Sequence, residues 1–176
     1  MIQLLPFTRR SFVIGACALA ALLGVVIWFD RADPMRNDGL TTYTDPVGRF
    51  KIYTIMLMNE SRHDIKLQSV QVNDGEMPMI AQLGVTYGSG HQVQYIGDQT
   101  DPAIRFMELR ALPIRPKASE EEIRAIIADR SPTPTYYGVM FRYDREPVRQ
   151  VTIRYTYYGL PKVKHIRSWF EFEVPF

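Results

Sequence analysis

The sequence predicts an all-β domain, a β-sandwich, that follows a single N-terminal membrane helix. Nineteen residues from Ser11 to Phe29 contain no charged side chain. After Thr41, short runs rich in β-branched and aromatic residues are separated by turn residues about every ten positions, which is typical of sandwiches and barrels. Only one later segment, near Glu120, has the pattern that begins a helix.

The segment 11–29 is long enough to cross a bilayer. At about 1.5 Å per residue, a helix of this length reaches roughly 28 Å, close to the ~30 Å hydrocarbon core. We therefore expect an uncleaved transmembrane anchor in contact with membrane lipid. Arg9 and Arg10 in the leader 1–10 favour a cytoplasmic N-terminus, and Trp28 suits the aromatic belt at the far interface.

The remainder of the chain is expected outside the cytoplasm. Residues 30–40 are polar and contain Pro34 and Gly39, so they predict a short stalk before a domain at 41–176. Residues 31–176 hold nineteen basic and eighteen acidic side chains. This balance argues against a nucleic-acid partner, because phosphate binding needs a concentrated basic surface.

Cys17 is the only cysteine, so the expected outer domain has no disulfide bond, which favours a bacterial envelope protein. Three alternatives for membrane targeting remain open. Ile14–Cys17 resembles a lipoprotein lipobox, in which Cys17 is acylated. Thr8–Val13 is similar to the twin-arginine export motif, and Ala18–Ala20 offers a signal-peptidase site within the apolar run.

The first predicted strand, 50–58, is a strongly apolar run. In the second predicted strand, 65–72, Ile65 and Leu67 share one face while Val70 and Val72 share the other, so a β-bulge is expected near Ser69. The predicted strands in this part of the chain are 50–58, 65–72, 77–87, 92–96 and 104–112.

One helix and three further strands complete the prediction. Ser119 and Glu122 form a capping box, which predicts a helix from Glu120 to about Asp129. The last two strands are expected to form a hairpin through Gly159–Pro161. A total of about seven to nine strands with one short helix fits an immunoglobulin-like sandwich. The predicted C-terminal strands are 137–143, 150–158 and 165–174.

No arrangement of catalytic side chains is apparent. The three histidines are isolated in sequence, and Gly88–His91 lacks the strand–turn–helix context of a nucleophilic serine. We therefore expect a protein without enzymatic activity and without a cofactor. An enzyme whose site joins distant residues, such as His91, Asp98 and Glu108, is kept as an alternative.

Two pairs of methionines suggest another alternative. Each pair has period-two spacing, which places its two thioethers on one face of a strand. Thioethers bind Cu(I), and a histidine would complete a site, so copper handling is a second candidate function. Ordinary core packing of the methionines is favoured over it. The residues of this candidate site are Met56, Met58, Met77, Met79 and His91.

A basic segment near the end of the chain is the candidate binding surface. Exposed tryptophan beside basic residues is common at binding hot spots, although charged residues also protect sheet edges from unwanted pairing. The residues of this surface are Lys162, Lys164, His165, Arg167 and Trp169.

The function predicted from sequence is a membrane-anchored binding or assembly module, with a protein partner in or at the membrane. Ala16, Ala20 and Gly24 recur every four residues in the anchor and form a stripe of small residues, which allows a second helix to approach closely. Sandwiches commonly present loops and edges to partners.

Overall fold

A computed structural model describes residues 9–167 of the chain, with the side chains of 9–12 and 30 left outside the description. The chain forms two compact units, Met1–Asp33 and Pro34–Phe176. Helix α1 (Arg9–Arg31) makes up most of the described part of the first unit, and its apolar side chains from Val13 to Trp28 are exposed. No helix within the described part of the chain is long and apolar enough to cross a membrane.

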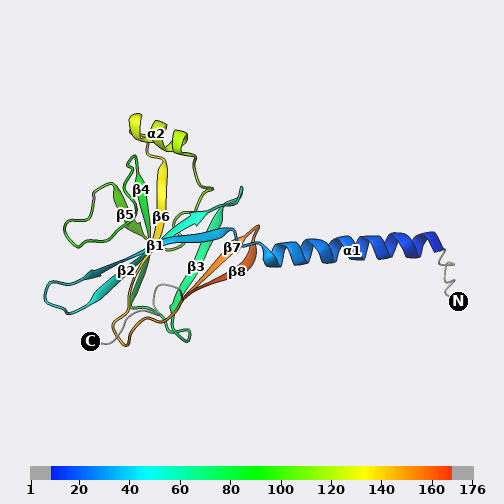
Figure 1. Cartoon of the computed structure of the whole chain (residues 1–176), viewed down its shortest axis with the longest axis horizontal. Helices are drawn as coiled ribbons and strands as arrows, with labels where there is room; N and C mark the ends of the chain where they lie inside the picture. Colours follow the sequence, from blue (N-terminus) through cyan, green and yellow to red (C-terminus); the bar gives the residue numbers. More distant parts are fainter. Residues whose placement is uncertain (1–8, 168–176) are drawn as a thin grey trace. The chain divides into compact units, whose positions relative to one another are not determined.

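The second unit is an antiparallel β-sandwich, which confirms the predicted all-β class (Figure 1). A five-stranded sheet has the order β1 (Met35–Thr44), β2 (Lys51–Asn59), β6 (Pro134–Arg142), β4 (Ile80–Tyr87) and β5 (Ile104–Met107). A three-stranded sheet has the order β3 (Ile65–Val72), β7 (Val151–Tyr157) and β8 (Leu160–Ile166). Helix α2 (Glu120–Ala128) lies in the connection from β5 to β6.

The main core follows the predicted alternation of apolar residues. In β7 one face contributes Val151, Ile153, Tyr155 and Tyr157, and all four are buried. From the larger sheet, Tyr53 of β2 stacks on a phenylalanine of β6 with ring centroids 5.2 Å apart. Burial of these large apolar surfaces is the main source of stability for a domain without disulfides.

The bulge predicted in β3 is confirmed. The register with β7 shifts between Leu67 and Ser69. Because a bulge moves later side chains to the other face, Ile65, Leu67, Val70 and Val72 are all fully buried despite their spacing.

A second, smaller core covers the other face of the larger sheet. Gly84 of β4 and Gly138 of β6 pair across the strands, and the side chain of Val93 fills the space above them. Val93 belongs to the segment between β4 and β5, and it packs with Met56 and Ile104. Both faces of β2 are therefore buried, as its continuous apolar run predicts.

The predicted strand 92–96 is wrong. This segment is irregular apart from a single bridge at Ile96. Val93 points into the second core, and the ring of Tyr95 contacts Tyr43 and Phe106 edge-on. The alternation that resembles a strand therefore reflects packing of a loop on a sheet, without strand pairing of its own.

Several element boundaries also differ from the prediction. β1 begins at Met35, which is fully buried and paired with Asn59, so it lies inside the segment expected to be a stalk. β8 begins at Leu160 because Tyr158 and Gly159 form a two-residue turn with φ of 53° and 76°. The predicted strand 165–174 falls largely outside the described residues.

Candidate functional site

A cleft of about 480 Å³ lies between α2, the segment 115–118 and the neighbouring ends of β2 and β6. Figure 1 shows α2 beyond the end of β4 and β6. Volumes of this size are typical of small-molecule sites. The lining is mainly apolar and includes Met56, Met58, Arg115, Pro116, Lys117, Ile123, Ile126, Pro134, Tyr136 and Tyr137.

Helix α2 forms one wall of the cleft. It begins with the predicted capping box: the Ser119 side chain accepts the Glu122 amide, and the Glu122 carboxylate accepts the Ser119 amide at 2.7 Å. None of its residues is buried, and Ile123 and Ile126 remain half-exposed towards the cleft. The apolar face of this amphipathic helix is therefore incompletely covered.

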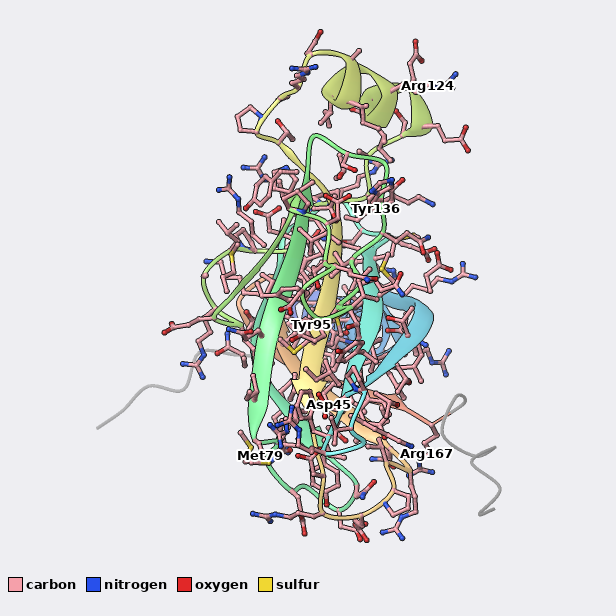
Figure 2. The ribbon with its side chains drawn as sticks, turned by 90° about the vertical axis from the view of Figure 1, so that its left-hand side faces the viewer. Asp45, Met79, Tyr95, Arg124, Tyr136 and Arg167 are labelled. Carbon is pink, nitrogen blue, oxygen red and sulfur yellow. The ribbon has the colours of Figure 1, made fainter. Side chains whose placement is uncertain are left out.

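The floor of the cleft comes from β2 and β6. Figure 2 shows Tyr136 just below α2. Met56 lines the cleft from beneath and continues into the second core around Val93. The hydroxyl of Tyr137 is buried, and burial raises the pKa of Tyr137, an effect that the backbone and the charge of Arg115 partly offset.

The rim of the cleft carries two basic side chains on a segment held in place by backbone bonds. Ile114 pairs with Ile65, and the Lys117 amide donates to the Asn59 carbonyl at 2.8 Å. The side chains of Arg115 and Lys117 are exposed and have no ion-pair partner within residues 9–167. Six of the other twelve arginines among residues 34–167 form ion pairs, namely Arg36, Arg49, Arg124, Arg142, Arg145 and Arg149.

Two acidic residues also line the cleft. Glu122 is engaged by the helix cap, and its hydrogen bonds with Ser119 lower the pKa of the Glu122 carboxyl. Asp38 is exposed and lies where the register of β1 skips a residue. The lining therefore holds two cations and two carboxylates, none of which forms an ion pair within the described residues.

The structure does not bring the predicted methionine set together. Met77 and Met79 are exposed and precede β4, whereas Met56 lies on β2, and β6 separates the two strands. The Met79 amide donates to the carbonyl of Arg142. Arg142 pairs with Ile52 near the start of β2, whereas Met56 pairs with Gly138 further along the strand. Figure 2 shows Met79 far from Tyr136. Among the described residues no group of three histidine, cysteine or acidic side chains is placed to hold a metal ion.

His91 pairs with a different acid from those proposed in the enzyme alternative. Its Nδ1 contacts the carboxylate of Asp101, and this hydrogen bond is the main cause that lowers the pKa of Asp101. Neither Asp98 nor Glu108 makes a described hydrogen bond or ion pair with His91. The pair joins the two ends of the segment that carries Val93.

The predicted basic surface is divided between the two sides of β8. Lys162 and Lys164 pair with Tyr155 and Ile153 of β7, which face the core, so the two lysines lie on the inward side of β8. His165 lies on the outward side. Arg167 donates its Nε hydrogen to a glutamine at 2.6 Å. Trp169 lies outside the described residues, so the surface as a whole stays a prediction. In α1 the small residues Ala16, Ala20 and Gly24 are all exposed.

Sequence reasoning missed the cleft because its walls come from four segments far apart in the chain. The one available signal was the short helix predicted from Glu120, in which Ile123, Ile126 and Ile127 share one side. Searches of protein-family models, of curated proteins and of solved structures find no match for the chain, so the cleft is interpreted from its own geometry.

Proposed function

We propose that this chain is a membrane-anchored binding module that takes up an apolar group in the cleft beside α2. The observation that carries the proposal is an open apolar cleft next to a helix whose apolar face is only half covered. Ligand sites are typically concave, mostly apolar and edged by a few polar groups. The described lining contains no histidine, cysteine or serine, the commonest bases and nucleophiles, which favours binding over catalysis.

The anchor and the location are proposed from the sequence. The uncharged run Ser11–Phe29 and the pair Arg9 and Arg10 support a membrane helix with a cytoplasmic N-terminus. The sandwich is then extracytoplasmic, and the lack of cysteine in it supports a bacterial envelope. A protein partner in or at the membrane remains part of the proposal.

The strand order supports an immunoglobulin-like arrangement. In that fold one sheet has the order A-B-E-D and the other C-F-G. Strands β1, β2, β6 and β4 match the first order, and β3, β7 and β8 match the second. On this assignment β5 and α2 form an insertion between strands D and E, and the cleft is a feature of that insertion.

Binding to the cleft is testable with the full chain in phosphatidylcholine nanodiscs. Methionine methyl groups report on the site by NMR, because Met56 and Met58 line the cleft whereas Met77 and Met79 lie elsewhere. Titration with octyl glucoside, an apolar chain with a neutral head, should shift the first pair of methyl signals and leave the second pair unchanged.

A matched pair of variants tests whether the cleft is responsible. Ala125→Trp fills the cleft and should abolish the shifts, whereas Ala128→Trp, on the same helix but outside the lining, should preserve them. Equal shifts at all four methionines, or shifts that survive Ala125→Trp, would refute the proposed site.

A further inference from the structure

We infer that the ligand of the cleft is a single-chain amphiphile with an anionic head group, an inference that rests on the proposed function. The apolar chain lies between α2 and the ends of β2 and β6. The head group, a carboxylate or a phosphate, contacts Arg115 and Lys117. The argument combines the charge of the rim with the size of the cleft.

The rim favours an anion. Arg115 and Lys117 are two residues apart, line the same cleft and have no ion-pair partner within the described chain. Guanidinium and ammonium groups form strong, charge-assisted hydrogen bonds with carboxylates and phosphates. Of the two acids in the lining, the Glu122 carboxylate accepts the Ser119 amide, and neither Glu122 nor Asp38 forms an ion pair with Arg115 or Lys117 among the described residues.

The position of these cations is fixed by the fold. The Asn59 side chain donates to the carbonyl of Ile114 at 2.9 Å, and the backbone of Asn59 accepts the Lys117 amide. Asn59 itself is buried. The segment that carries the two cations is therefore held against the end of β2, so a head group meets charges whose backbone is already ordered.

The size of the cleft suits a single slim chain. It holds about 480 Å³, which lies within the range of small-molecule sites. An extended acyl chain is much thinner than a helix, and flexible methionine side chains such as Met58 adapt to such a surface. A single-chain lipid thus fits both the volume and the charge.

The test compares probes that share an eight-carbon chain and differ in their heads. The full chain in phosphatidylcholine nanodiscs is titrated with octyl phosphate, octanoate, octyl glucoside or octyltrimethylammonium, and Met56 and Met58 methyl shifts report binding. We expect octyl phosphate, octanoate or both to bind at least about 10-fold more tightly than octyl glucoside, with the cationic probe weakest. Which of the two anions binds more tightly identifies the head group.

Two double variants separate specific contacts from general charge. Arg115→Gln with Lys117→Gln should reduce the preference for the anionic probes to within about twofold. Arg62→Gln with Lys66→Gln removes the same charge from exposed residues outside the cleft, and it should leave the preference intact.

The inference and the proposed function fail in different ways. Equal binding of all four heads, or a preference that survives loss of Arg115 and Lys117, would overturn the anionic ligand while leaving the cleft as a binding site. Shifts with an acidic amphipathic peptide but not with octyl phosphate or octanoate would overturn it in favour of a peptide. Absence of shifts with every probe would overturn both.

Discussion

Asn73 connects two loops of the sandwich through a fully used side chain. It is buried with φ of 49°, donates to Glu146 at 2.7 Å and to the Pro147 carbonyl at 3.1 Å, and accepts the Arg149 amide at 2.7 Å. Asn73→Gly keeps the positive φ but removes these bonds, so we predict a loss of about 2–4 kcal/mol in the free energy of unfolding. Urea unfolding followed by circular dichroism measures it.

The control for this change lies in the same turn. Asp74 is exposed, and Asp74→Gly should alter the free energy of unfolding by less than about 0.5 kcal/mol. If Asn73→Gly lowered the free energy of unfolding no more than Asp74→Gly does, the hydrogen bonds of Asn73 to the loop after β6 would contribute little to stability.

Asp45, in the turn between β1 and β2, gives a pH-dependent prediction. Its buried carboxylate accepts the Arg49 Nε hydrogen at 2.9 Å, and this bond is the main cause that lowers the pKa of Asp45 below 3.8. Because the pKa of Asp45 is lower in the folded state, the ionised carboxylate stabilises the folded state fully above the ordinary pKa of an aspartate. This stabilisation is lost as the pH falls through the lowered pKa of the folded state. The stability gap between wild type and Asp45→Asn should therefore narrow below about pH 4.

Urea midpoints at a series of pH values from about 7 to about 2 measure this gap. Asp74→Asn, at an exposed residue, serves as the comparison. A gap that stays constant down to the lowest pH would show that the Arg49 contact does not favour the ionised form of Asp45.

At the scale of elements, Val93 and the paired glycines hold the loop before β5 on the larger sheet. A Cβ atom on Gly84 would lie 2.4 Å from Val93 Cγ1 and 2.8 Å from Phe106 Cε1. We predict that Gly84→Ala lowers the free energy of unfolding by about 1–3 kcal/mol through overpacking. Thermal unfolding measures the loss, and Gly39→Ala, where the nearest atom is 3.7 Å away, should be tolerated.

A double-mutant cycle tests the mechanism. In a Val93→Ala background the space above Gly84 is partly empty, so the added methyl group of Gly84→Ala should cost much less. Purely additive effects of the two changes would show that Val93 and Gly84 do not compete for the same space.

Local patterns predicted those elements whose residues determine them locally. The cap at Ser119 and Glu122 fixes the start of α2, and the phase change after Leu67 fixes the bulge in β3. The strand predicted at 92–96 failed because alternation records which side chains are buried, and the side chain of Val93 is buried by a sheet to which its backbone does not pair.

The candidate site was less accessible from sequence for a physical reason. The continuous apolar run along β2 predicted that Met56 is buried, but only the fold shows that Ile126 and Tyr136 line the same space. Which charged side chains form ion pairs is likewise determined by the fold. The sequence contains Arg115 and Lys117, but it does not indicate which arginines pair with the acidic residues, as Arg145 does with Glu76.

At the scale of the molecule, the position where the sandwich begins can be tested by truncation. Within residues 9–167 the buried hydrophobic core residues lie between Met35 and Ile166, so a chain that begins at Pro34 should protect the amides of β2 from hydrogen exchange as well as the full chain does. A chain that begins at Thr41 lacks Met35, which is fully buried, and half of β1. Loss of a large core side chain and of edge-strand pairing should reduce β2 protection by about 100-fold or more. Equal protection in the two truncated chains would instead place the start of the folded unit at Thr41, with Met35 in the stalk that the composition of residues 30–40 predicts.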